Sequence, residues 1–322
     1  MMTMSNHECT ILCPGQGAQT VGMGKAWVEA SPQAAAVMAE ADQILSDTLS
    51  KSLSESCFEG PVELINRTDI SQPAILACSV ACWHGMRELD VLVNVGVTAG
   101  LSLGEYTALH LAGAMSFEDA LRTVAARGRL MQEAAETSKG GMVALMGADD
   151  ETQASSFCES VLAGLPDGEV LVSANFNAPG QIVLSGSMGA WDAAVAAAGD
   201  SGFRAKALPV AGAFHSPLMQ SAADQMADVL DKIDLNVPDV PVWSNVTAVP
   251  HENDVLSIKH RLVEQITHPV RWSQSLVDMI EQGCGGFHEL APGKVLKGLM
   301  KRIDRKLEVR NHDTPDTTAV QS

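Results

Sequence analysis

The chain has 322 residues, of which 46% are hydrophobic and 19% charged, which is typical of a globular protein with a substantial core and excludes a disordered or fibrous one. Its 21 basic and 39 acidic residues give a net charge of −18, which argues against a nucleic-acid-binding function. Residues 1–10 lack a secretory pattern and no apolar run approaches the roughly 18 residues of a membrane-spanning helix, so we expect a cytoplasmic protein without nucleic-acid or membrane partners.

The first part of the chain alternates strands, glycine turns and helices. A short apolar strand at 10–13 runs into the turn Pro14-Gly15-Gln16-Gly17, and an apolar, β-branched strand at 91–97 precedes a helix at 105–111. The other helices expected here span 31–45, 73–89 and the residues from Ser116, a capping residue, through 136. This alternation predicts an α/β fold with a central, mostly parallel sheet.

The pattern changes after Lys139-Gly140-Gly141. The expected order is strand, helix, two strands around an Asn-Pro-Gly turn, helix and strand, which is the order of a ferredoxin-like unit. These elements are placed at 142–146, 149–162, 169–174, 181–185, 191–198 and 203–208. We therefore predict a ferredoxin-like small subdomain at 138–208, inserted into the larger one.

Alternation returns beyond the insert. The elements expected there are a helix at 217–232, a strand at 240–244, helices at 254–267 and 272–281, a strand at 287–290 and a last helix from 292. The predicted domain organisation is a large α/β subdomain at 1–137 and 209–310, the insert at 138–208, and a flexible tail at 311–322.

The seven cysteines are an odd number and form no C-x-x-C pair, which argues against a disulfide framework and against a zinc site. Cys78, Cys82 and His84 lie close together in sequence, but they fall within the mostly apolar helical pattern at 73–89. We interpret these cysteines as small buried hydrophobic residues and expect no metal.

Ser102 lies in Gly100-Leu101-Ser102-Leu103-Gly104, between an expected strand and an expected helix. A serine on such a turn needs glycine two residues before and two residues after it, because a side chain there would collide with the strained backbone. The turn exposes the hydroxyl, and the helix start offers free N–H groups to an oxyanion. Ser102 is therefore a candidate nucleophile, and the alternative is an ordinary helix-capping serine.

A serine nucleophile needs a base, and spacing cannot choose among the nine histidines, since catalytic partners meet in space. His215 stands in a loop after an expected strand, where functional side chains are common, although a structural histidine fits this position equally well. Arg127 stands at the edge of the apolar stripe of its helix. It could extend along the surface to water, or it could face a pocket and bind a carboxylate.

Five segments in order resemble the malonyl-CoA:acyl-carrier-protein transacylase family over about residues 10–305. They are Pro14-Gly15-Gln16-Gly17-Ala18-Gln19, Gly100 to Tyr106, Arg127-Gly128, Ala213-Phe214-His215-Ser216 and His268-Pro269-Val270-Arg271-Trp272. The resemblance implies a hydrolase-like large subdomain that carries a ferredoxin-like insert, in agreement with the organisation predicted above.

The resemblance also assigns roles. It implies that Ser102 is the nucleophile and His215 the base, oriented by a backbone carbonyl near Gln265 instead of by an aspartate. It implies an oxyanion hole formed by the N–H groups of Gln16 and Leu103. It further implies that Arg127 matches the arginine that binds the free carboxylate of malonate.

Other matches are less direct. Phe214 resembles the residue associated with malonyl over methyl-branched units, and Asn175 and Asn177 resemble a further pocket segment. One departure is Leu101, because many members of the family have histidine before the serine. That replacement removes a polar group beside the nucleophile but leaves the catalytic pair.

The function that the resemblance implies is transfer of malonyl from malonyl-CoA to the phosphopantetheine thiol of acyl carrier protein through an acyl-serine, supplying fatty-acid or polyketide synthesis. No cofactor is expected, since the CoA thioester is itself the substrate, and we expect a monomer. The alternatives are a serine esterase or thioesterase and a non-catalytic carrier-binding module. Lys294, Lys297, Lys301 and Arg305 recur at helical spacing, either as a docking stripe for CoA phosphates or acidic carrier protein, or as a solvated face.

Overall fold

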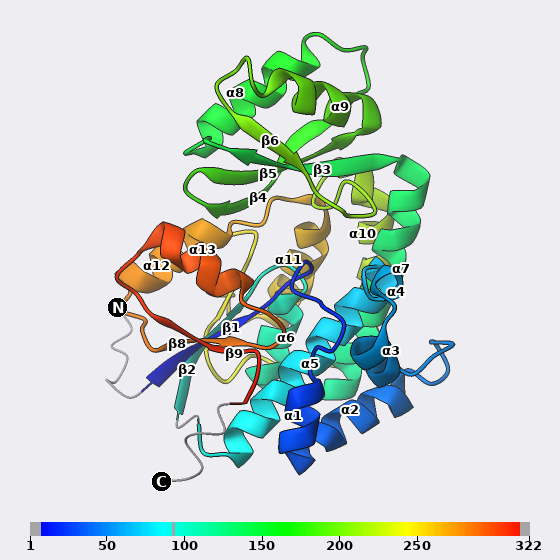
Figure 1. Ribbon diagram of the computed structural model, residues 1–322, viewed down its shortest axis with the longest axis vertical. Coiled ribbons are helices and arrows are strands. Elements are labelled where there is room, and N and C mark those ends of the chain that lie inside the picture. Colours follow the sequence, from blue (N-terminus) through cyan, green and yellow to red (C-terminus); the bar gives the residue numbers. More distant parts are fainter. Residues whose placement is uncertain (1–7, 92–93, 316–322) are drawn as a thin grey trace.

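The computed structural model describes residues 8–91 and 94–315, and within them the strands form two separate sheets (Figure 1). The larger sheet has the order β7-β2-β1-β8-β9 and all of its pairs are parallel. Its strands are β1 (Glu8–Cys13), β2 (Asn94–Gly100), β7 (Val242–Trp243), β8 (Phe287–Leu290) and β9 (Val309–His312). This parallel sheet, connected through helices, confirms the predicted α/β class.

Helices cover the large sheet because each parallel connection must cross back over it. The helices before the second sheet are α1 (Lys25–Ala30), α2 (Pro32–Ile44), α3 (Leu53–Glu59), α4 (Val62–Ile65), α5 (Thr68–Glu88), α6 (Gly104–Leu111) and α7 (Phe117–Ser138). The helix predicted at 73–89 corresponds to α5, but its predicted start is wrong, because α5 begins at Thr68 and includes Pro73. Its polar first turn looks like a loop in the sequence, yet Thr68, Ser71 and Gln72 are all buried.

The register of the two central strands places two loops side by side. β1 and β2 run parallel, with Cys13 paired to Gly100 at their carboxyl ends. The loop that contains Gln16 follows one strand and the turn that contains Ser102 follows the other. Since ligands of open parallel sheets bind beyond the carboxyl ends of the strands, this register brings two predicted site segments to the expected edge.

The smaller sheet is antiparallel, with the order β4-β5-β3-β6. Its elements follow the chain as β3 (Gly140–Met146), α8 (Glu151–Leu162), β4 (Leu171–Ala178), β5 (Gln181–Ser187), α9 (Met188–Ala197) and β6 (Arg204–Ala207). In Figure 1 both helices lie above the sheet, whose other face is turned toward the rest of the molecule. Order and topology confirm the predicted ferredoxin-like unit.

The remaining elements are the 3₁₀ helix η1 (Pro217–Met219), α10 (Gln220–Asp231), α11 (Val255–Thr267), α12 (Trp272–Glu281) and α13 (Val295–Ile303). Several strand bounds differ from those predicted; β4, for example, is Leu171–Ala178 instead of 169–174. β2 begins at Asn94 instead of 91, with residues 92–93 outside the described part, and β9 was not predicted. The flexible tail cannot begin at 311, because Asn311 and His312 pair with β8 and Trp27 Nε1 donates to the His312 carbonyl at 2.8 Å. Residues 316–322 lie outside the described chain.

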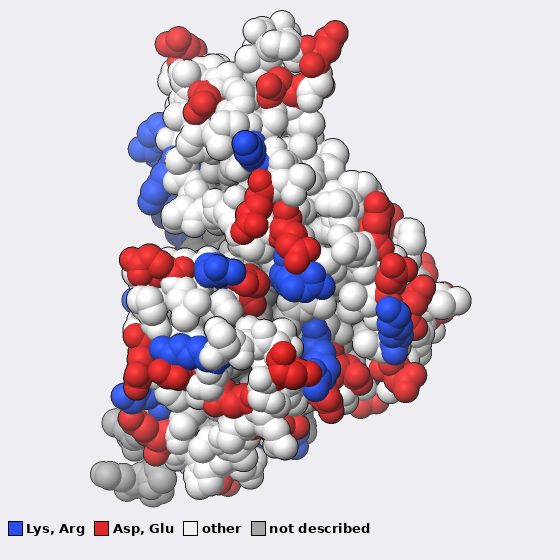
Figure 2. Space-filling view, turned by 90° about the vertical axis from the view of Figure 1, so that its right-hand side faces the viewer, with Lys and Arg blue, Asp and Glu red and all other residues white. Residues whose placement is uncertain are grey.

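Charged side chains of both signs are spread over the face shown in Figure 2. The predicted basic stripe is shorter than expected, because α13 ends at Ile303 and Arg305 lies beyond it. Lys297 and Lys301 remain on the helix, and Lys294 precedes its first turn. Among the described helices, none is long and apolar enough to cross a membrane.

The cysteines behave as the sequence indicates. All seven are free thiols, and Cys78 and Cys82 are completely buried within α5. Burial raises the pKa of the Cys82 thiol to about 12, so this sulfur stays protonated. These residues therefore fill the core as small hydrophobic side chains.

Candidate active site

Ser102 occupies a sharp turn between β2 and α6, with a φ of +54°. The flanking glycines are required by close backbone contacts. A Cβ on Gly100 would lie 1.9 Å from the carbonyl carbon of Gly104, and a Cβ on Gly104 would lie 2.3 Å from the carbonyl oxygen of Cys13. The turn therefore has the geometry of a nucleophile elbow, which holds the serine hydroxyl away from the sheet.

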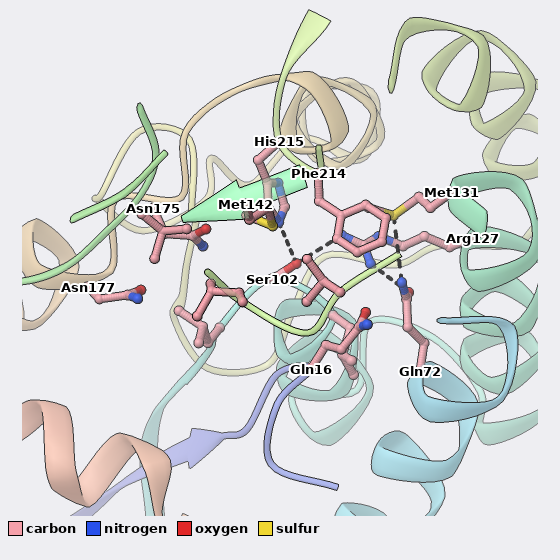
Figure 3. Close-up of a pocket in the computed structure, with 15 residues that line it drawn as sticks. Gln16, Gln72, Ser102, Arg127, Met131, Met142, Asn175, Asn177, Phe214 and His215 are labelled. Carbon is pink, nitrogen blue, oxygen red and sulfur yellow. Dashed lines mark hydrogen bonds between the residues drawn. The ribbon is translucent and has the colours of Figure 1, made fainter. Parts of the chain in front are cut away.

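His215 is the histidine that the fold brings to this serine. Ser102 Oγ lies 2.8 Å from His215 Nε2 (Figure 3). His215 Nδ1 lies 2.7 Å from the backbone carbonyl of Gln265. A carbonyl can only accept, so Nδ1 carries the proton and Nε2 is free to accept from the serine hydroxyl. His215 itself has a φ of +56°, and its loop is held by a hydrogen bond from Ser185 Oγ to the Phe214 carbonyl.

The environment keeps the imidazole of His215 neutral. Burial lowers its pKa to about 3, with a further lowering by the nearby positive charge of Arg127 and an opposing effect of the Gln265 carbonyl. A neutral imidazole is the form that can remove a proton from serine. The pair therefore stands ready for acyl transfer without a third acidic member.

Arg127 points into the protein from α7, and only 1% of its surface is exposed, so it does not reach along the surface to water. Its two terminal nitrogens donate to Gln72 Oε1 at 2.6 Å and to Ser102 Oγ at 3.1 Å (Figure 3). One of them also donates to Gln265 Oε1 at 2.8 Å. Its Nε has no hydrogen-bond partner in the described structure. Burial lowers the pKa of Arg127, although the guanidinium of arginine remains charged. The site thus holds a buried cation beside Ser102, the candidate nucleophile.

These side chains line one pocket, together with residues of the small sheet, of the loops after β1 and β2, and of α5 and α7. The lining residues are Gln16, Gln72, Leu101, Ser102, Leu103, Arg127, Met131, Met142, Asn175, Asn177, Val183, Leu208, Val210, Phe214 and His215. The structure therefore gathers around Ser102 the predicted Gln16, Leu103, Phe214 and both asparagines. Gln265 lies behind the pocket wall and contacts Arg127 and His215.

The chain matches the acyl transferase domain family over residues 10–315. It is 41% identical over 315 residues to a malonyl CoA-acyl carrier protein transacylase of Bacillus subtilis, covering 96% of this chain and 95% of the relative. The chain belongs to the malonyl-CoA:acyl-carrier-protein transacylase family. A solved member of the family from Xanthomonas oryzae pv. oryzae superposes with a TM-score of 0.90 at 38% identity over 98% of each chain. A second solved structure, of a malonyl-transacylase in complex with its type II PKS acyl-carrier protein, superposes on this chain with a TM-score of 0.89 at 37% identity, covering 97% of each chain.

Two backbone N–H groups of this transacylase-family site are unoccupied donors. Within the described chain, the N–H groups of Gln16 and Leu103 donate to no protein acceptor. Leu103 directly precedes the first turn of α6, where the helix dipole favours negative charge. Both positions suit an oxyanion hole for an acyl group on Ser102.

Several residues that support the site could not be identified directly from the sequence. The Ser102 N–H donates to Asn245 Oδ1 at 2.6 Å, and Asn245 Nδ2 donates to the Gly100 carbonyl at 2.7 Å. Asn245 lies just beyond the carboxyl end of β7, and this position is the one sequence signal that could have found it. Gln72 was missed because its turn of α5 looks like a loop.

Proposed function

We propose that this chain transfers a malonyl group from malonyl-CoA to the phosphopantetheine thiol of acyl carrier protein through an ester on Ser102. The observation that carries the proposal is the guanidinium of Arg127, 3.1 Å from the nucleophilic oxygen and buried. A serine and histidine pair alone suits any acyl group. A buried cation at this distance suits a short acyl group that ends in a carboxylate.

In the first half-reaction His215 Nε2 takes the proton of Ser102, and the serine oxygen attacks the thioester carbonyl. The N–H groups of Gln16 and Leu103 hold the resulting oxyanion. Collapse breaks the bond from carbon to sulfur, and the departing CoA thiolate takes the proton from His215. The products are the malonyl ester of Ser102 and free CoA.

The second half-reaction runs the same steps in the opposite direction. The phosphopantetheine thiol gives its proton to His215, and its sulfur attacks the ester carbonyl. The bond from carbon to Ser102 breaks, and the serine oxygen recovers the proton. Substrate and product are both thioesters, so the enzyme only lowers barriers, and we propose that it needs no cofactor.

Selectivity for malonyl follows from the surroundings of Arg127. Charge-assisted hydrogen bonds are worth about 1.5–3 kcal/mol each, whereas an acetyl group would leave this guanidinium without an acid partner. Phe214 lies in the same pocket and narrows it against methyl-branched units, an effect of about 1–3 kcal/mol per methyl group. Asn175 and Asn177 reach the pocket from β4 and serve to bind the substrate.

Hydrolysis is the competing chemistry, since the serine turn is shared with esterases and thioesterases. Family membership favours transfer. The deciding experiment follows malonyl-CoA with the purified protein, with and without holo acyl carrier protein, and weighs the carrier by mass spectrometry. We expect malonyl-carrier to form at the rate at which malonyl-CoA disappears. Equal loss of malonyl-CoA without carrier, and an unmodified carrier, would contradict the proposal.

We further propose that the insert at 138–208 and the remainder of the chain act as two subdomains of a cytoplasmic monomer. The pocket supports this division, because β3, β4 and β5 supply lining residues from the insert, and the loops after β1 and β2 with α5 and α7 supply them from the remainder of the chain. Sedimentation of the purified chain tests the monomer.

A further inference from the structure

Glu105 is a buried carboxylate that none of the steps above uses. It lies in the first turn of α6, three residues after the nucleophile, and its side chain is 0% exposed. It accepts three hydrogen bonds: from His251 Nε2 at 2.7 Å, from Gln265 Nε2 at 2.6 Å and from the backbone N–H of Asn245 at 3.2 Å. A charge buried this completely persists only when it is fully bonded, so each donor matters.

The position of Glu105 determines which way the amide of Gln265 points. A carboxylate can only accept and the guanidinium of Arg127 can only donate, so an amide between them must turn its NH₂ to one and its oxygen to the other. The distances agree: Gln265 Nε2 donates to Glu105, and Gln265 Oε1 accepts from Arg127 at 2.8 Å. The same NH₂ also donates to the Ser102 carbonyl at 2.9 Å. Glu105 therefore orients Arg127 through one amide.

This arrangement also leaves the charge of Arg127 available to the carboxylate of a substrate, because its hydrogen-bond partners in the described chain are neutral. Among the described residues no carboxylate forms an ion pair with Arg127, and Glu105, which acts on it electrostatically, is held one amide away. A carboxylate in direct contact would compete with the carboxylate of the acyl group. The intervening amide accepts one hydrogen bond from Arg127 but carries no charge, so it does not replace the carboxylate of the acyl group.

His251 fixes Glu105 from the side opposite Gln265. It lies in the segment after β7, its backbone N–H donates to the Val242 carbonyl at 2.8 Å, and its side chain is only 2% exposed. Its Nε2 must donate, because the carboxylate oxygen can only accept. We propose that Glu105 and His251 form a positioning pair, which sets the orientation of the Gln265 amide and thereby aligns Arg127 for the carboxylate of the acyl group. This inference rests on the proposed malonyl transfer.

The test compares two substitutions of His251. His251→Gln keeps a donor near the place of Nε2, whereas His251→Asn is polar but too short to reach Glu105. For each variant, kcat/KM is measured for acylation of Ser102 by malonyl-CoA and by acetyl-CoA. We expect His251→Asn to lower the value for malonyl-CoA about tenfold and that for acetyl-CoA less than about threefold, and His251→Gln to restore the wild-type ratio. His260→Gln is the matched control, because this histidine is exposed on α11.

A parallel fall for both substrates in His251→Asn, or no fall at all, would overturn the positioning role. If His251→Asn does not fold, Glu105→Gln replaces it, since a neutral amide accepts more weakly than a carboxylate and leaves the Gln265 NH₂ held chiefly by the Ser102 carbonyl. The same selective loss is expected there, and a parallel loss again refutes the inference. Failure of the proposed function is a separate result, because then the wild-type protein itself would not be malonylated.

Discussion

Replacement of Arg127 by alanine is the perturbation that separates a malonyl-specific enzyme from a general acyl-serine enzyme. The guanidinium makes three hydrogen bonds at rest, and its Nε has no partner within the described chain. If a malonyl carboxylate takes two charge-assisted bonds at about 1.5–3 kcal/mol each, the variant loses about 3–6 kcal/mol with this substrate. At about 1.4 kcal/mol per factor of ten, kcat/KM for malonyl-CoA should fall by about 10² to 10⁴.

The assay uses a ratio, because Arg127→Ala also leaves the amide oxygens of Gln72 and Gln265 without the donor that Arg127 supplies. That damage affects malonyl-CoA and acetyl-CoA alike and cancels when the two kcat/KM values are divided. Arg129→Ala is the matched control on the same helix, since Arg129 is exposed and, among the described residues, its ion pair is with Glu133. An unchanged ratio of malonyl to acetyl in Arg127→Ala would refute the reasoning.

Three further outcomes are expected. The pKa of His215 is lowered to about 3, so the pH dependence of acylation should show no inflection near pH 6.5. Between about pH 6.5 and 3 the imidazole binds a proton in the unfolded chain but not in the folded one, so the free energy of unfolding should fall as the pH drops through this range. Urea titrations of wild type and His215→Gln should differ in this slope. Gly104→Ala should lower the free energy of unfolding, measured in urea, by about 1–3 kcal/mol or more. Gly298→Ala, whose added methyl group meets open space in α13, should raise it by up to about 1 kcal/mol. Equal effects of the two substitutions would contradict the tight turn. Reversing the charge of Lys297 and Lys301 should raise the KM for carrier protein and weaken its salt dependence, and no change would return both to a solvated face.

Local signals predicted the parts of the fold that local interactions determine. The helix expected from Ser116 begins there, because Ser116 Oγ accepts the N–H of Asp119 at 3.0 Å, which is a contact within one turn. The β-α-β-β-α-β order was predicted from turn residues and strand patterns. β9 was missed because Val309–His312 is a short strand whose pairing with β8 gives no local signal.

The site was predicted in part for the same reason. The glycines around Ser102 reveal its turn. The close contact of Gly100 is local, with Gly104, whereas Gly104 is also required by the carbonyl of Cys13, which only the folded structure brings near. Nothing local selects His215 over the other histidines, and the resemblance supplied it. Asn245 and Glu105 support the site from 140 residues apart in the chain, so only the folded structure shows that they meet.

The central claim is that a malonyl group rests on Ser102 between the two half-reactions. The most direct test mixes the purified protein with malonyl-CoA in the absence of carrier, quenches it in acid and locates the adduct by peptide mass spectrometry. The account predicts one malonyl group on the peptide that contains Ser102, none in Ser102→Ala, and loss of the adduct when holo carrier protein is added. An unmodified Ser102, with transfer intact in Ser102→Ala, would contradict it.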